Sequence, residues 1–281
     1  LKRDIITNEL VDDKWWISPL LVLLGLLIFI VYSTWAAWQG EYFWWSGGSD
    51  GFGGYLSPFY SPTVYIDALK PGVPPVDHSL LGSWPEWLSW LPGQSPAWLI
   101  LIFPLSFRFT CYYYRKAYYR AFSLNPPACA VQPIKGMPSK ISALTNGNIN
   151  AFSSGKRYEG ETGLLLVQNI HRYAMPFSVI LIFILSYDAF LSFFNDGRFG
   201  IGVGTIVLTI NPILLGCYTF GCHSIRHLIG GNIDCYSCSL YKDKVNHGGW
   251  RIVTILNRRH QLFAWLSLIW VGFADVYVRL V

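Results

Sequence analysis

Long apolar stretches alternate with polar segments along the chain, and the apolar stretches have the length of a bilayer. The first, residues 17–38, contains 22 residues without a charged side chain. About 20 predominantly apolar residues allow a helix to cross the hydrocarbon core of a membrane. We expect transmembrane helices at residues 17–38, 97–114, 173–194, 201–225 and 260–281. The pattern predicts an all-α integral membrane protein, a five-helix transmembrane bundle forming a single domain over residues 1–281.

The composition indicates that lipid is the surrounding solvent. Of the 281 residues, 52% are hydrophobic and only 13% are charged, whereas a soluble domain carries roughly 25% charged residues. Several of the 13 tryptophans lie beside the apolar stretches, among them Trp15, Trp16, Trp38 and Trp98. Tryptophan prefers the membrane interface because its ring is apolar and its N–H is polar. We expect membrane lipid as a partner, and no nucleic acid.

Lys and Arg are distributed unequally between the two sides of the predicted bundle. With five spans, the N-terminal segment and the loops 115–172 and 226–259 share one side, where seventeen of the 21 Lys and Arg residues fall. Basic residues stay on the cytoplasmic side of a membrane. We therefore expect a multi-pass protein of the plasma membrane, with a cytoplasmic N-terminus and an extracytoplasmic C-terminus. Residues 39–96 then form a large extracytoplasmic loop, which we interpret as an ordered cap.

Histidine and cysteine residues gather near the cytoplasmic ends of three predicted spans. Cys111 lies near the end of the second span, and His171 precedes the third. Cys222 and His223 lie near the end of the fourth span, and His227, four residues later, shares the helix face of His223. Ionisable groups are costly in a bilayer, so this layer is a candidate functional site. Taken singly, a membrane histidine more often forms a helix–helix hydrogen bond, and a cysteine more often packs as a small apolar residue.

Imidazole and thiolate are the usual ligands of redox iron, and two kinds of centre suit these residues. A b-type haem would take one histidine from each of two facing helices, namely His171 with either His223 or His227. A Rieske-type [2Fe–2S] cluster would take two cysteines and two histidines, with Cys111 and Cys222 as candidate thiolates. The residues alone leave the choice open.

Charged and aromatic residues within the spans are further candidates. Arg108 in the second span and Asp188 in the third could line a path for a quinone or for protons, or they could pair across the two helices. The tyrosines after Arg108, including Tyr112 and Tyr113, could shape a quinone pocket or belong to an aromatic belt.

Three more cysteines lie in the predicted cytoplasmic loops. Cys129 could replace Cys222 as a thiolate ligand. Cys235 and Cys238 form a lone C-x-x-C pair that could bind zinc or form a disulfide. One such pair is half of a structural zinc site, so we favour no ligand role for it.

Longer motifs around these residues resemble a known family. They are residues 55–62 (YLSPFYSP), 108–120 (RFTCYYYRKAYYR), 126–131 (PPACAV), 169–173 (NIHRY) and 222–227 (CHSIRH). Together they resemble the membrane anchor subunit of a succinate dehydrogenase/fumarate reductase complex, of the single-chain, five-helix kind found in actinobacterial-type enzymes. The motifs extend from about residue 55 to the C-terminus and cover most of the chain.

The resemblance implies a subunit of succinate dehydrogenase (quinone), respiratory complex II, with no soluble active site of its own. A flavoprotein subunit would oxidise succinate at FAD, an iron–sulfur subunit would pass electrons on, and this anchor would deliver them to a quinone (menaquinone or ubiquinone). It also implies a membrane-embedded Rieske-type [2Fe–2S] cluster, or haem b, with ligands among Cys111, His171, Cys222, His223 and His227. One position departs from the family pattern, because Thr63 stands where we expect a cysteine.

Two other kinds of protein would use the same residues differently. One is a structural anchor without a bound cofactor, and the other is a membrane protein that handles metal ions through histidine and cysteine. A transporter should show inverted repeats and paired broken helices, and the sequence contains none that we detect.

Overall fold

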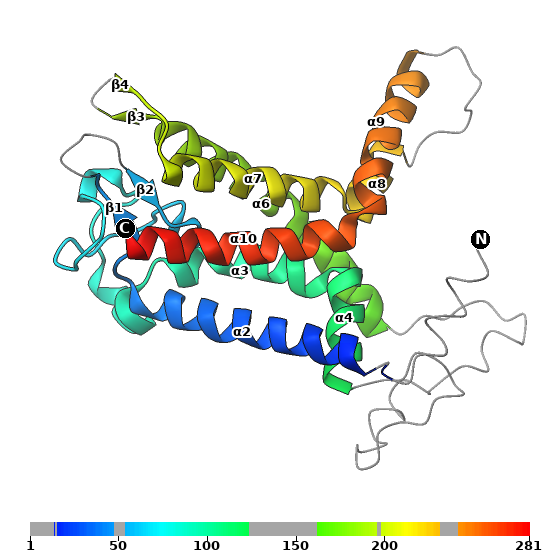
Figure 1. Ribbon diagram of the computed structural model, residues 1–281, viewed down its shortest axis with the longest axis horizontal. Helices are drawn as coiled ribbons and strands as arrows, with labels where there is room; N and C mark the ends of the chain where they lie inside the picture. Colours follow the sequence, from blue (N-terminus) through cyan, green and yellow to red (C-terminus); the bar gives the residue numbers. More distant parts are fainter. Residues whose placement is uncertain (1–13, 15, 48–53, 124–161, 196–197, 231–240) are drawn as a thin grey trace, which may run out of the picture. The chain divides into compact units, whose positions relative to one another are not determined.

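The computed structural model describes residues 14, 16–47, 54–123, 162–195, 198–230 and 241–281. Most of them are helical, which confirms the prediction of a mostly helical membrane protein (Figure 1). The helices are α2 (Ile17–Gln39), α3 (Ala97–Thr110), α4 (Tyr112–Ser123), α6 (Thr162–Leu191), α7 (Val203–Phe220), α8 (His223–Gly230), α9 (Tyr241–Arg258) and α10 (His260–Leu280).

Four described helical stretches are long and apolar enough to cross a membrane, so the chain is a multi-pass membrane protein. They are Ile17–Gln39, Ile170–Leu191, Val203–Phe220 and His260–Leu280. The second predicted span differs, because α3 has 14 residues and ends at Thr110. A helix of that length extends about 21 Å, less than the roughly 30 Å of a hydrocarbon core. By length and composition, the described helices therefore include four candidate spans and one shorter apolar helix.

The chain forms two compact units. The first comprises residues 1–30 and 108–171, and the second comprises residues 31–107 and 172–281. Two of the predicted ligands, Cys111 and His171, belong to the first unit, and Cys222, His223 and His227 belong to the second.

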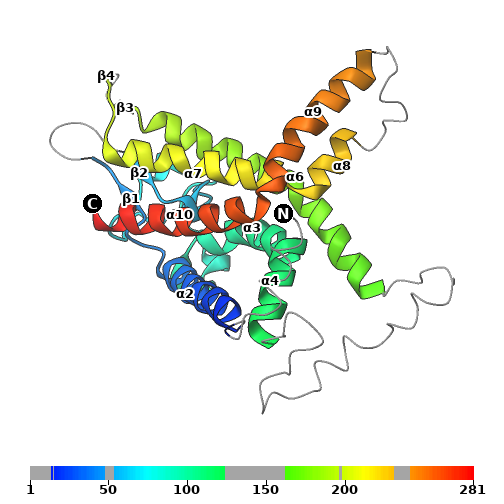
Figure 2. The ribbon, with the colours of Figure 1, turned by 45° about the vertical axis from the view of Figure 1, so that its right-hand side comes forward.

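In the second unit, α7 and α10 pack side by side (Figures 1 and 2). Buried positions of α10 carry small residues, including Ala264, Ser267 and Gly272. Small side chains let membrane helices approach closely, so that van der Waals contacts can hold them together. The indole Nε1 of Trp270 also donates a hydrogen bond to the carbonyl of Val207 on α7, at 3.0 Å.

The cap, described at residues 40–47 and 54–96, is an ordered structure within the second unit. Strand β1 (Trp44–Trp45) pairs antiparallel with β2 (Tyr55–Leu56), and four 3-10 helices follow: η1 (Pro58–Tyr60), η2 (Val76–His78), η3 (Glu86–Leu88) and η4 (Pro92–Gln94). Phe43 stacks on Tyr60 with ring centroids 4.0 Å apart. Tyr55 is buried in a cluster with Ala189 of α6, Leu208 of α7 and Val278 of α10. The cap thus shares an apolar core with three helices.

A glycine allows the cap to return to the end of α2. Gly93 has a φ of +62°, and a Cβ on it would lie 1.7 Å from the carbonyl oxygen of Trp38. Only glycine tolerates both the left-handed backbone and the close approach. A second hairpin, β3 (Phe194–Asn195) with β4 (Arg198–Phe199), connects α6 to α7.

Candidate functional site

In the first unit, the candidate ligands lie at the break between α3 and α4. Cys111 separates the two helices and is buried, as are Thr110 and His171. The hydroxyl of Thr110 lies 3.1 Å from Nδ1 of His171. A hydrogen bond to one imidazole nitrogen orients the ring and selects which nitrogen carries the proton. If Nδ1–H donates to Thr110, the Nε2 lone pair of His171 is available to a metal.

The predicted quinone residues surround the same break. Arg108 donates a hydrogen bond to the hydroxyl of Tyr114 at 2.6 Å, and its guanidinium also lies 5.6 Å from the centre of that ring. Tyr113 packs edge to face on Tyr114 at 5.7 Å. Tyr112 is exposed, and the guanidinium of Arg115 lies 5.9 Å from its ring centre. Arg108 is thus fixed by a buried tyrosine, while Tyr112 remains accessible.

In the second unit, the candidate ligands lie at the turn between α7 and α8. Gly221 and Cys222 form this turn, and Cys222 is buried. A Cβ on Gly221 would lie 3.2 Å from Cβ of Leu256 on α9, so the turn and α9 are in close contact. The side-chain amide of Asn257 donates to the carbonyl of Gly221 at 2.8 Å and holds the turn in place.

His223 and His227 form a pair on α8. Their ring centroids are 4.6 Å apart and the rings are nearly perpendicular. Both residues are exposed and lie beyond Phe220, where the candidate span ends. Local desolvation lowers the pKa of His223 below its ordinary value, and the positive charges of His227, Arg226 and Arg172 lower it further. His223 is therefore held neutral, which is the form that binds metals.

The structure brings some of the predicted residues together and leaves others apart. It places Thr110 beside His171, and His223 beside His227. Among the residues that the structure describes, no three His, Cys, Asp or Glu side chains form a group that could hold a metal ion. Cys129, Cys235 and Cys238 lie outside the described residues. The assignment of metal ligands therefore stays a prediction.

The second unit also contains a buried polar network, centred on Asp275, that was not predicted from the sequence. Asp275 on α10 accepts hydrogen bonds from Tyr32 on α2 at 2.6 Å, from Ser57 in the cap, and from Nε of Arg279 at 2.8 Å. Arg279 also donates to the carbonyl of Ala36 at 3.2 Å. Asp275 and Arg279 are four residues apart on one helix, a spacing that the sequence already showed. Their partners from α2 and the cap could not be read from any local pattern.

The cap also binds the carboxylate of Asp188, and the serine that does so belongs to the same 55–62 motif as Ser57. Ser61, four residues after Ser57, donates a hydrogen bond to Asp188 of α6. Asp188 thus has a serine partner, and Arg108 has a tyrosine partner. Thr63, at the position where a cysteine was expected, is buried and donates to the carbonyl of Tyr60 at 3.4 Å. Its hydroxyl therefore has a structural role in the cap.

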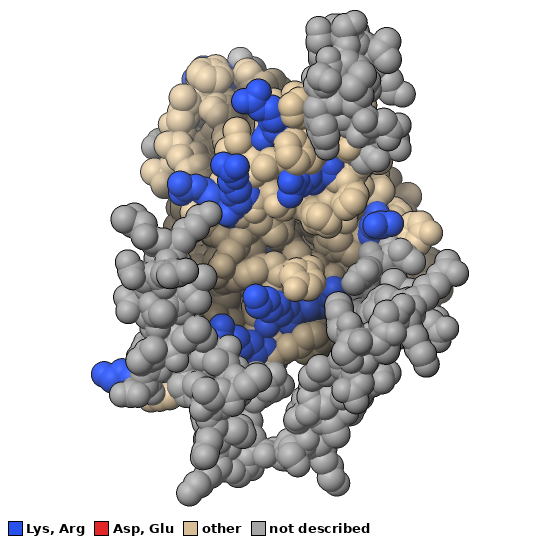
Figure 3. Space-filling view, turned by 90° about the vertical axis from the view of Figure 1, so that its right-hand side faces the viewer, with Lys and Arg blue, Asp and Glu red and all other residues tan. Residues whose placement is uncertain are grey.

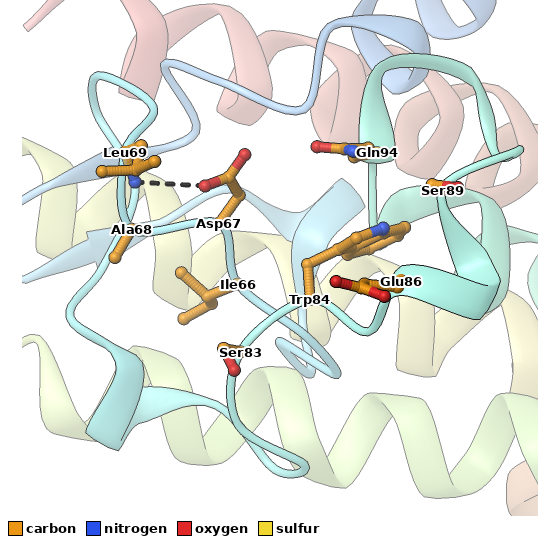
Figure 4. Close-up of a pocket in the computed structure, with 9 residues that line it drawn as sticks. All are labelled: Ile66, Asp67, Ala68, Leu69, Ser83, Trp84, Glu86, Ser89 and Gln94. Carbon is orange, nitrogen blue, oxygen red and sulfur yellow. Dashed lines mark hydrogen bonds between the residues drawn. The ribbon is translucent and has the colours of Figure 1, made fainter.

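The described residues contain two further concave regions, both in the second unit. The larger, with a volume of about 720 Å³, is an open depression in the cap, where Asp67, Trp84 and Glu86 are lining residues (Figure 4). Asp67 accepts a hydrogen bond from the backbone of Leu69 at 3.2 Å. The smaller, about 370 Å³, is an apolar groove between α6 and α7, with Cys217 on its wall. Neither contains any of the predicted ligands.

Exposed arginines lie on α9 and directly after it. Blue Lys and Arg side chains, and no red Asp or Glu, are visible among the described residues in the view of Figure 3. Arg251 and Arg258 of α9, and Arg259 between α9 and α10, are all exposed. The histidines of α8 thus belong to the same unit as these arginines, and the side of the membrane on which they lie stays a prediction.

Comparison with known proteins identifies the family. The sequence matches the family described as actinobacterial succinate dehydrogenase subunit SdhC over residues 17–281. It also matches a chain in the solved structure of the Mycobacterium smegmatis Sdh1 complex in the apo form, with 37% identity, a TM-score of 0.71, and coverage of 96% of this chain and 89% of that chain. No curated protein matches the sequence significantly. Because the match spans nearly the whole chain and confirms the resemblance seen in its motifs, the chain belongs to the actinobacterial SdhC family and is a membrane anchor subunit of succinate dehydrogenase.

Proposed function

We propose that this subunit transfers electrons from the soluble part of succinate dehydrogenase to a membrane quinone through a bound redox group. The observation that carries the proposal is the pair of buried cysteines at helix breaks. Cys111 lies beside Thr110, which contacts His171, and Cys222 lies directly before His223. Thiolate and imidazole together are the donor set of a Rieske-type [2Fe–2S] cluster, and imidazole alone is the donor set of haem b.

The residues fit such a group by their chemistry. Burial keeps Cys111 and Cys222 away from solvent, and Thr110 can orient the ring of His171. The lowered pKa of His223 keeps its imidazole in the form that binds metal. We propose that the ligands come from Cys111, His171, Cys222, His223 and His227. When bound, the group would supply reversible one-electron transfer, and the protein would supply its ligands and set their protonation states.

The partners follow from the family and from the charged end of the protein. We propose that a flavoprotein subunit with FAD and an iron–sulfur subunit bind at the basic cytoplasmic end, with the N-terminus inside and the C-terminus outside. Arg108, Tyr112 and Tyr113 are the proposed contacts of the quinone. The hydrogen bond from Arg108 to the buried Tyr114 supports this role, because it holds a cation in place at the break where the exposed Tyr112 begins α4.

Spectroscopy of the purified complex tests the proposal. A reducible Rieske-type paramagnetic signal that is lost in Cys111→Ser and Cys222→Ser variants would support the cluster, and a reducible b-type absorption band would support haem. The control is Cys217→Ser, since Cys217 lies within α7 on the wall of the apolar groove and should not affect the signal. If the anchor gives neither the paramagnetic signal nor the haem band, in a complex whose iron content has been fully accounted for, the proposal of a bound redox group is refuted.

The alternative is a structural anchor without a redox group. It is favoured by the contacts that already engage the three histidines, because Thr110 contacts His171, and His227 packs against His223. In that case electrons would reach the quinone from the soluble iron–sulfur subunit directly. Succinate:quinone activity that persists in the Cys111→Ser and His223→Ala variants would favour this alternative.

A further inference from the structure

We propose that α9 is an interfacial helix that lies on the membrane surface and binds anionic lipid headgroups through Arg251 and Arg258. The inference concerns a helix that contains none of the proposed redox ligands. It requires only that the chain spans a membrane, so it can succeed or fail independently of the electron-transfer proposal.

One face of α9 is apolar and uncovered by the described residues. Val245, Ile252 and Ile255 are 53%, 65% and 65% exposed. On a helix with 3.6 residues per turn, these positions fall within about 80° of one another. Gly248 lies on the same stripe, and a Cβ on it would meet nothing within 4 Å. Exposure of several branched apolar side chains on one stripe indicates a surface that another apolar medium covers.

The opposite face of α9 is already occupied. Val253 is buried, and α9 packs against α8. A Cβ on Gly230 of α8 would lie 2.4 Å from the ring of Trp250, and the guanidinium of Arg226 lies 4.7 Å from the centre of that ring. The exposed stripe is therefore the side of α9 that α8 leaves free.

Two arginines border the apolar stripe. Arg251 and Arg258 are seven residues apart, so they lie one above the other along α9. Both are exposed, and neither forms an ion pair with any residue that the structure describes. Their aliphatic stems can cover apolar surface while the guanidinium groups reach phosphate oxygens. The charge of this border is complementary to an anionic membrane surface.

The position of α9 places this face at the end of two candidate spans. Helix α10 begins at His260, directly after Arg259, and Asn257 is hydrogen-bonded to the turn that follows α7. Figures 1 and 2 show that α9 runs across the direction of α10 and does not continue it. Helix α10 itself exposes Leu262 and Leu266 in its first turns. The apolar stripe of α9 thus begins where a lipid-facing helix surface ends.

These features favour lipid as the occupant of the stripe. A helix with an apolar face, basic residues at its border and a position at the membrane boundary has the pattern of interfacial amphipathic helices. A protein partner covering the stripe is the competing occupant, and the experiment separates the two.

The test uses the whole succinate dehydrogenase complex in vesicles of phosphatidylcholine, with or without phosphatidylglycerol. Nitroxide spin labels are placed at Val245→Cys, Ile252→Cys and Ile255→Cys, with Asn246→Cys and Thr254→Cys as controls on other faces of α9. The labelled parent complex gives the background from native cysteines. Collision rates with oxygen, which concentrates in lipid, and with a water-soluble nickel chelate are then compared.

We expect the ratio of oxygen to nickel collisions to be highest at the three stripe positions and to rise when phosphatidylglycerol is present. Arg251→Gln and Arg258→Gln are then introduced into the complex that is labelled at Ile252→Cys. Each arginine removed should shift the equilibrium between membrane-bound and detached α9 toward the detached state by about fivefold. High nickel accessibility at all five positions would overturn the proposal. So would low accessibility to both reagents that increases only when the soluble subunits are removed, because that result indicates a protein partner.

Discussion

The Asp275–Arg279 pair offers the sharpest test of how the cap is held on the membrane helices. The side chains of Arg279 and Asp275 are 7% and 0% exposed, so solvent screens them little. Replacing Asp275 with Asn leaves the charge of Arg279 buried without its carboxylate, and breaking a buried pair in this way costs about 3–5 kcal/mol. Because Arg279 keeps its hydrogen bonds to Ala36 and Gln39, we expect a loss near 3 kcal/mol, the lower end of that range.

A double-mutant cycle separates the ion pair from the other contacts. Arg279→Gln should also destabilise the protein, because Asp275 then loses its cationic partner and keeps only Tyr32 and Ser57 as donors among the described residues. The double variant Asp275→Asn/Arg279→Gln removes both charges, so its loss should be smaller than the sum of the single losses by about 0.5–3 kcal/mol.

Free energies of unfolding can be measured in mixed micelles by titration with a denaturing detergent, with far-UV circular dichroism as the signal. Ser186→Ala is a matched control, because the one hydrogen bond of its hydroxyl among the described residues goes to the carbonyl of Ile182 in its own helix. Strict additivity of the two single losses, or full stability of Asp275→Asn, would refute the argument that a buried charge pair holds this end of the bundle.

Three other predictions address the site and the cap. Replacing His223 with Ala should abolish the redox spectrum of the anchor while its spans remain inserted, and an unchanged spectrum would assign the role to His227. Gly93→Ala should destabilise the protein by more than about 1 kcal/mol, since strained backbone costs about 1–3 kcal/mol and the Cβ would also overlap the Trp38 carbonyl. The control is Gly82→Ala, which measures the backbone cost alone, because Gly82 has a φ of +89° and open space around it. The folded-state pKa of His223 lies below its unfolded value of about 6.5. The unfolded chain therefore binds the proton first, so stability should fall as pH drops through that value, and His223→Asn should reduce this pH dependence.

The apolar stretches predicted the helices well where one uninterrupted stretch forms one helix. Residues 17–38 and 260–281 were expected as spans, and the structure has helices at Ile17–Gln39 and His260–Leu280. The expected span at 97–114 instead ends at Thr110 and restarts at Tyr112. Hydrophobic periodicity could not reveal this break, because the residues on both sides of Cys111 are compatible with a helix. The break matters, since it sets the buried position of a proposed ligand.

The sequence by itself determined the solvent of the protein, its family and the residue types available for a redox site. Those properties depend on composition and on contiguous motifs, which need no knowledge of the fold. The tertiary structure decided which groups meet. Ser57 binds Asp275 across 218 positions of sequence, and Tyr32 binds the same carboxylate across 243. A buried carboxylate needs donors wherever the fold can supply them, and only the packing of the cap and α2 against α10 determines that these two residues supply them.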